Sequence, residues 1–179
     1  FWYGAGRAIS KAFPRNEWRA FPAPSVFSLA AAKFGWSLED TLCIGLHAAP
    51  LARLRRYLTP GLQAIVLLRD GNAVNELAML LASTGFDQSV LYVCEALGGP
   101  RENINALTVA EAQAGSFIHP VCVAVEVMGQ GAVIPLSIGR PDDLFETDGV
   151  MTKRPIRALT LSALAPRAGE HLWDIGGGS

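Results

Sequence analysis

Continuous apolar runs that alternate with helical segments are the feature that most constrains the fold of this chain. The strand-like runs lie in TLCIGLH (41–47), QAIVLLRDGN (63–72), SVLYVCEALGGP (89–100) and PVCVAVEVMG (120–129). Helical patterns separate them, and this alternation indicates an α/β fold. Because the strands are apolar almost throughout, we expect a sheet that is covered on both faces.

The helix expected between Asn72 and Gly85 has the strongest periodicity in the chain. Its apolar residues recur at helical spacing, with Asn72 placed as the N-cap and Gly85 as the end; they are Val74, Leu77, Ala78, Leu81 and Ala82. Weaker patterns predict four further helices and one short strand. The helices cover residues 5–13, 25–35, 50–58 and 108–115, and the strand covers 17–21.

Residues 129–150 break this pattern, because Gly, Pro and acidic residues occur there without a sustained period. A new unit follows, with Pro155 in the first turn of a helix and HLWDI (171–175) as a strand. One helix and one strand cannot bury themselves, so this unit must pack on residues 1–150 or belong to a domain that is cut off. Since no strand precedes the opening FWYGAG, we interpret the chain as a segment of a longer polypeptide.

Composition excludes several classes of partner. The chain has 179 residues, of which 50% are hydrophobic, and 15 Lys and Arg balance 16 Asp and Glu. This balance predicts neither a nucleic-acid nor an anionic-membrane partner, and no apolar run is long enough to span a bilayer. The cysteines lie singly in apolar runs, which favours core thiols in a reducing cytoplasm; they are Cys43, Cys94 and Cys122. The histidines have no metal-binding spacing, so no metal is expected.

Two glycine motifs suggest cofactor sites. GAGRA (4–8) is similar to a dinucleotide fingerprint, but Glu17 lies too near and Glu39 too far to be the acidic residue expected about 20 positions later. WDIGGGS (173–179) has three interpretations: a flexible linker, the strand-to-glycine turn of a class I methyltransferase, or a nucleotide site of the Rossmann type.

A few polar residues stand at strand ends or inside apolar runs. His47 ends a strand before two alanines and is either ligand-facing or a surface histidine. Glu126 lies inside an apolar strand and needs a partner if buried, whereas Glu95 ends a strand and is the more exposed candidate acid. His119 and His171 begin strands and are expected to face solvent. No residue is identified as a catalytic base.

Several segments, in their order along the chain, resemble the tetrapyrrole methylases. FWYG at residues 1–4 is similar to the segment after that family's G-D-P loop, and FPAPSVFSLAAAKFGWSLEDT (21–41) to its P-G-(I/V)-S-S segment. IGLHAAPLARL (44–54) resembles S-L-H-G-R-P, and CEALGGPRENI (94–104) resembles E-N-L-G-G-P-x-E. Residues 138–179 are similar to the entry into a second, decarboxylating methyltransferase domain.

The resemblance implies an S-adenosylmethionine-dependent enzyme that methylates two bridge carbons of precorrin-6Y and decarboxylates an acetate side chain in cobalamin biosynthesis. It implies the C-terminal part of a two-lobed tetrapyrrole methylase domain, followed by the first helix and strand of a class I (Rossmann-like) methyltransferase domain. The corresponding parts are the end of the N-terminal lobe, the C-terminal lobe, a linker and the truncated second domain, at residues 1–36, 37–128, 129–150 and 151–179. It also implies a homo-oligomer and a tetrapyrrole substrate.

Cofactor-binding residues follow from the resemblance, position by position. In the first domain they are Trp2, Tyr3, Ser25, Val26, Leu46, His47, Ala96 and Leu97; in the second they are Asp174, Gly176 and Gly178. The chain departs from the family pattern at Ala23 and in HAAP (47–50), which lacks the arginine of H-G-R-P. We expect the 179 residues alone to have little or no activity. The alternatives are a non-enzymatic α/β interaction module that ends in a linker, and a nicotinamide-dependent enzyme built on GAGRA.

Overall fold

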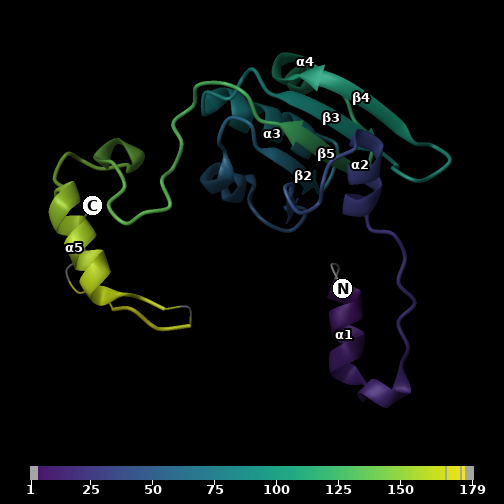
Figure 1. The fold of residues 1–179 in the computed structure, drawn as a ribbon, viewed down its shortest axis with the longest axis horizontal. Coiled ribbons are helices and arrows are strands. Elements are labelled where there is room, and N and C mark those ends of the chain that lie inside the picture. The colour runs from purple at the N-terminus through teal and green to yellow at the C-terminus, as the bar shows by residue number, and fades with distance from the viewer. Residues whose placement is uncertain (1–3, 168, 174, 176–179) are drawn as a thin grey trace.

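A five-stranded mixed sheet forms the centre of the computed structural model, which describes residues 4–167, 169–173 and 175 (Figure 1). The strand order is β1-β2-β5-β3-β4. Only β1 and β2 pair in parallel, and the other three pairings are antiparallel. The strands are β1 (Leu42–Gly45), β2 (Gln63–Leu67), β3 (Val90–Glu95), β4 (Asn103–Thr108) and β5 (Val121–Glu126).

The pairing directions bring the ends of several strands together at one end of the sheet. Strands β1, β2 and β3 run in the same direction, and β5 is inserted between β2 and β3 in the opposite direction. The carboxyl ends of β1, β2 and β3 therefore lie at the same end of the sheet as the first residues of β4 and β5. Residues that follow one set of strands and precede the other are thus neighbours in space.

Both faces of the sheet are covered, as the apolar strands predict. Helices α3 (Asn72–Ser83) and α4 (Val109–Ala114) and the 3-10 helix η2 (Leu51–Tyr57) pack on one face, and α2 (Val26–Phe34) packs on the other. The central strands β2 and β5 are almost wholly buried. Helix α3 buries Val74, Leu77, Ala78 and Leu81, and burial of each leucine contributes about 1.5–3 kcal/mol.

The two ends of the chain form helices that stand away from the sheet (Figure 1). They are α1 (Gly4–Ala12), followed by the 3-10 helix η1 (Arg15–Glu17), and α5 (Arg154–Leu164), preceded by the 3-10 helix η3 (Asp142–Leu144). Pro155 lies in the first turn of α5, as predicted. The Arg157 guanidinium ties α5 to residues before it, because Nη1 donates to Asp142 Oδ1 at 2.8 Å and the group stacks 4.6 Å from the Phe145 ring.

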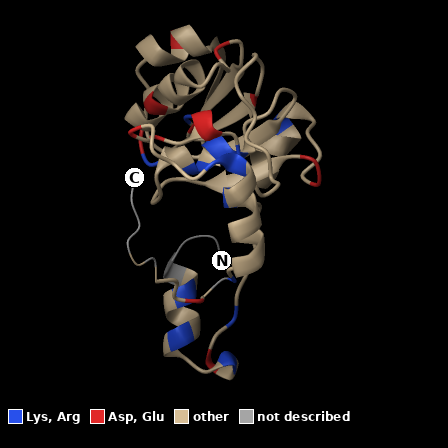
Figure 2. Cartoon of the chain, turned by 90° about the vertical axis from the view of Figure 1, so that its left-hand side faces the viewer, with Lys and Arg blue, Asp and Glu red and all other residues tan. Residues whose placement is uncertain are grey.

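Basic and acidic residues are nearly equal in number, 15 against 16. Figure 2 shows basic and acidic residues interspersed, and neither sign fills a face of its own in that view. Within the described part of the chain, no helix combines the length and the apolar character needed to cross a lipid bilayer.

Several predicted elements are wrong. Residues 17–21 form no strand, because the chain there makes a 3-10 turn and then extends between prolines without a neighbouring strand. Residues 171–173 of HLWDI are not a strand either. The predicted helix at 50–58 is a 3-10 helix. Asn72 is the first residue of α3 and not its cap; the Ala73 N–H donates to Asp70 Oδ1 at 3.0 Å instead.

Candidate functional site

Helix α2 begins at the end of the sheet where β1, β2 and β3 stop. Ser25 is its N-cap, and its Oγ accepts a hydrogen bond from the Ser28 N–H at 3.1 Å. Ser25 Oγ also lies 2.9 Å from Ser28 Oγ. The predicted site residue Ser25 therefore stabilises the start of the helix, a role worth about 1 kcal/mol. Val26 follows as the first helical residue and is half-buried.

Val26 and Leu97 both line a cavity of about 80 Å³ at this end of the sheet. Its remaining lining comes from the ends of β2 and β3 and the start of β5: Leu67, Leu68, Cys94, His119, Pro120, Val121 and Cys122. The walls are mostly apolar. The volume is below the roughly 300 Å³ of a typical small-molecule site, so the cavity has room for no more than one part of a ligand of ordinary size.

The loop that carries Leu97 is held in place by Glu102. Glu102 Oε2 accepts from the Gly98 N–H at 2.7 Å, and Glu102 Oε1 lies 2.5 Å from Lys33 Nζ on α2. The Ala96 N–H donates to the Pro120 carbonyl at 2.8 Å, and Ala96 has a φ of 47°. The loop is thus attached both to α2 and to the segment before β5, and these contacts set the walls of the cavity.

We expect Glu102 to give this loop an acid-sensitive attachment. Hydrogen bonds from Lys33 and from the Gly98 N–H hold the pKa of Glu102 below its ordinary value of 4.5. A lowered folded-state pKa stabilises the fold above the unfolded-state value, and that contribution is lost as the pH falls through the folded-state pKa. In urea unfolding, wild type should therefore exceed Glu102→Gln in stability at about pH 7, and the difference should shrink below about pH 4. A difference that is constant with pH would contradict this assignment.

Glu95, the candidate acid at the end of β3, has a structural position. Its Oε1 accepts from the Ile118 N–H at 2.5 Å and its Oε2 from the Asn103 amide at 2.8 Å. These bonds connect β3 to β4 and to the segment before β5. Glu95 and Ala96 also line a second cavity of about 130 Å³, together with Arg101, Asn103, Ile118 and His119.

Glu126 lies at the opposite end of the sheet, at the end of β5. Its nearest polar partner is the Tyr92 hydroxyl, which donates to Glu126 Oε2 at 3.4 Å. Burial and this carboxylate raise the pKa of Tyr92. Glu126 is therefore separated from the residues that line the cavities at the other end of the sheet.

Leu46 and His47 follow β1 and line neither of the two cavities at Val26 and Ala96. Leu46 is buried, and its N–H donates to the Leu67 carbonyl at 2.9 Å. It lines a third cavity of about 290 Å³ beside η2. His47 is half-buried. The structure therefore brings Val26 and Leu97 into one cavity and places Ala96 and Leu46 in two others.

The cysteines are free thiols, and two of them form the floor of the 80 Å³ cavity. Cys94 and Cys122 are buried and directly opposite each other on β3 and β5, whereas Cys43 is only half-buried. A hydrogen bond with Cys94 and burial raise the pKa of the Cys122 thiol. Among the described residues there is no group of three or more potential metal ligands.

Sequence reasoning missed the segment before β5. His119 is exposed but lines two of the cavities, and a cis peptide bond joins it to Pro120. Nothing in the sequence shows that β5 lies between β2 and β3, so the position of His119 beside Leu97 could not be derived from it. The other predicted site residues lie outside the described part of the chain: Trp2, Tyr3, Asp174, Gly176 and Gly178.

Comparison with known proteins identifies two family patterns in the chain. The family described as "Tetrapyrrole (Corrin/Porphyrin) Methylases" matches residues 1–113, and the one described as "Precorrin methyltransferase domain" matches residues 143–179. The first match covers more than half of the chain. The chain therefore belongs to the tetrapyrrole methylase family, which confirms the family indicated by its motifs.

Curated relatives align with the whole chain. A Sinorhizobium protein named precorrin-6Y C(5,15)-methyltransferase [decarboxylating] is 48% identical over 100% of this chain and 44% of its own length. A Mycobacterium tuberculosis protein of the same name is 39% identical over 99% of the chain and 44% of its own length. The chain thus spans less than half the length of these relatives. A solved precorrin-6Y methylase from Archaeoglobus fulgidus is 20% identical, with a TM-score of 0.41 over 60% of this chain and 47% of that one.

Proposed function

We propose that the protein containing this chain is an S-adenosylmethionine-dependent methyltransferase that methylates and decarboxylates precorrin-6Y in cobalamin biosynthesis. The observation that carries the proposal is the match of two different methyltransferase patterns on one chain, at residues 1–113 and 143–179. Relatives that align over the whole chain carry the corresponding double activity in their name. No described residue is assigned as the catalytic base.

The 80 Å³ cavity fits part of S-adenosylmethionine. Its apolar walls suit the flat adenine ring, and the nearby thiols and leucines offer no charge that opposes it. We propose that Val26 and Leu97 contact the cofactor from two sides, with Ser25 and Ala96 holding their backbones in place. Leu46 lines a different cavity and His47 follows it in the sequence, so we leave these two residues out of the proposed cofactor contacts.

The proposed domains follow one another along the chain. We propose that residues 1–36 end an N-terminal lobe, 37–128 form the C-terminal lobe, 129–150 link, and 151–179 begin a second, Rossmann-like methyltransferase domain. In the second domain we assign cofactor contacts to Asp174, Gly176 and Gly178. The exposed apolar residues of α5, Ile156 and Leu159 among them, fit a helix that packs on further parts of such a domain.

When bound, S-adenosylmethionine supplies an electrophilic methyl group. The described residues contribute position, because a cavity wall that holds one end of the cofactor fixes where its methyl group lies relative to the substrate. The Glu102–Lys33 contact and the Glu95 hydrogen bonds keep that wall rigid. The described part of the fold thus contributes to the reaction mainly by aligning the cofactor with the substrate.

The test uses the full-length gene product with precorrin-6Y and S-adenosylmethionine that carries a labelled methyl group. The proposal predicts that two labelled methyl groups enter the tetrapyrrole and that carbon dioxide is released, both detected by mass spectrometry. Residues 1–179 alone should transfer little or no label. Methylation of another class of acceptor, with precorrin-6Y left unchanged, would contradict the proposed substrate.

A further inference from the structure

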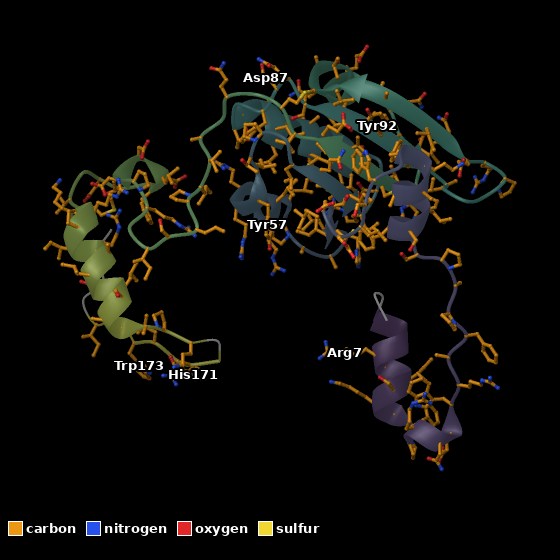
Figure 3. The ribbon with its side chains drawn as sticks, viewed as in Figure 1. Arg7, Tyr57, Asp87, Tyr92, His171 and Trp173 are labelled. Carbon is orange, nitrogen blue, oxygen red and sulfur yellow. The ribbon has the colours of Figure 1, made fainter. Side chains whose placement is uncertain are left out.

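The cavity beside β1 has a lining unlike that of the cavity at Val26 and Leu97. It holds about 290 Å³ and is bounded by the end of β1 and by one side of η2, with Ile44, Gly45, Leu46, Arg53, Arg56 and Tyr57 as its walls. Figure 3 shows Tyr57 at the margin of the sheet-bearing part of the molecule, well separated from Tyr92 on β3. The cavity shares no lining residue with the Val26–Leu97 cavity, so it is a separate site, and its two arginines give it a basic side.

Two arginines of this cavity have no acidic partner. Arg53 and Arg56 are exposed, and neither forms an ion pair within residues 4–167, 169–173 and 175, whereas Arg69 and Arg157 both do. Arg55, between them, is turned elsewhere and donates to the Ala132 carbonyl at 2.6 Å. Two positive charges thus face the same hollow.

The neighbouring groups favour an anion there. The Arg56 guanidinium lies 4.8 Å from the Tyr57 ring, which restricts its orientation. Among the residues that the structure describes, strand β1 pairs with β2 alone, and the Leu46 N–H points toward β2, where it donates to the Leu67 carbonyl. Because successive residues of a strand direct their N–H groups to opposite sides, the Gly45 N–H points away from β2, and Gly45 lines the cavity. Guanidinium groups beside a backbone N–H match the oxygens of a carboxylate.

We infer that Arg53 and Arg56, with the Gly45 N–H, bind a peripheral carboxylate of the tetrapyrrole substrate. This inference rests on the proposed function. Strand β1 adjoins β2 at a spacing of about 4.8 Å. Leu46 of the arginine cavity donates its N–H to the carbonyl of Leu67, which lines the Val26–Leu97 cavity, so the two cavities are neighbours where β1 and β2 end. A macrocycle that lies across these strand ends, with its reacting carbon at the methyl donor, carries an acidic side chain to the arginines. The substrate is anchored by its rim while its reacting carbon lies near the methyl donor.

The amino-acid end of S-adenosylmethionine also carries a carboxylate, so the two sources must be separated. The arginine cavity lies on the face covered by η2 and α3, whereas Val26 packs on the face covered by α2. A cofactor held by Val26 and Leu97 is thus on the other side of the sheet. We assign the arginines to the substrate for this reason.

The test measures the full-length protein with both arginines replaced by glutamine (Arg53→Gln with Arg56→Gln). KM for precorrin-6Y should rise at least roughly tenfold for each lost charge-assisted contact, and kcat should change less than about threefold. The Kd of S-adenosylmethionine, measured by calorimetry, should stay the same. A double lysine variant (Arg53→Lys with Arg56→Lys) should recover part of the loss, because it keeps the charge but not the planar fork.

The matched control is Arg69→Gln, which removes an exposed arginine whose charge is already paired with Asp70. It should leave KM unchanged. An equal rise of KM in the control, or no rise in the double variant while wild type turns over normally, would overturn the inference but leave the proposed function intact. A weaker cofactor Kd with unchanged KM would assign the arginines to the cofactor and also overturn it. If wild type neither binds nor converts precorrin-6Y, the proposed function fails and the inference fails with it.

Discussion

Replacing Gly71 by alanine is expected to destabilise the chain by about 3 kcal/mol. An added Cβ at Gly71 would lie 1.9 Å from the Phe117 carbonyl oxygen and 2.7 Å from its carbon. The obstacle is backbone, so no side-chain rotation can remove it. Gly71 precedes α3, while Phe117 belongs to the segment before β5 that lines the cavities. The substitution should therefore loosen that segment as well as lower the free energy of unfolding.

Gly61→Ala is the control for this prediction. Gly61 has a φ of 86°, but no atom lies within 4 Å of the added Cβ. Its cost should be limited to conformational strain of about 1 kcal/mol. Gly71 has helical angles that alanine adopts freely, so the larger effect there must be steric. Equal losses in thermal or urea unfolding of the two variants would contradict this account of the packing.

Filling the cavity at the end of β2 should remove cofactor binding. Val26→Trp or Leu97→Trp places a large ring in a space of about 80 Å³, whose walls include the strand residues Leu67, Cys94 and Cys122, which are buried in the packed sheet. We expect the Kd of S-adenosylmethionine in the full-length protein to rise at least about a hundredfold, because an excluded ring loses its whole contact surface. Both positions are half-buried at the cavity mouth, so the fold should persist.

Leu136→Trp supplies the matched control, since Leu136 is 90% exposed and lies in the segment after β5. Calorimetry should give it a wild-type Kd. Circular dichroism should show the same helix content for all three tryptophan variants. If the Val26 and Leu97 variants bind S-adenosylmethionine as tightly as wild type, the cofactor does not occupy this cavity.

Local signals were sufficient to predict the central elements. Helix α3 and strands β2 and β5 were predicted because each has buried residues along its whole length. Such residues are apolar, so they leave a visible pattern in the sequence. Strand β4 was missed because it is an edge strand with mostly exposed residues. Its ladder with β3 is a long-range pairing that a short polar sequence does not reveal.

Predicting the candidate site depended on resemblance more than on physics. Val26 and Leu97 were selected by family motifs, and the structure places them in one cavity. The order of strands explains why their neighbours were not found. Insertion of antiparallel β5 between β2 and β3 brings Cys122 opposite Cys94 and His119 beside Leu97. Each of these residues looks isolated along the chain, and only the pairing of distant strands unites them.

The most direct test of the central claim is a crystal structure of the full-length protein with S-adenosylhomocysteine, the product of methyl transfer. The account predicts that the ligand contacts Val26 and Leu97 and enters the cavity at the ends of β2 and β3. It also predicts that the cavity of Arg53 and Arg56 is left free for the substrate. A ligand bound elsewhere, with the Val26–Leu97 cavity empty, would contradict the claim.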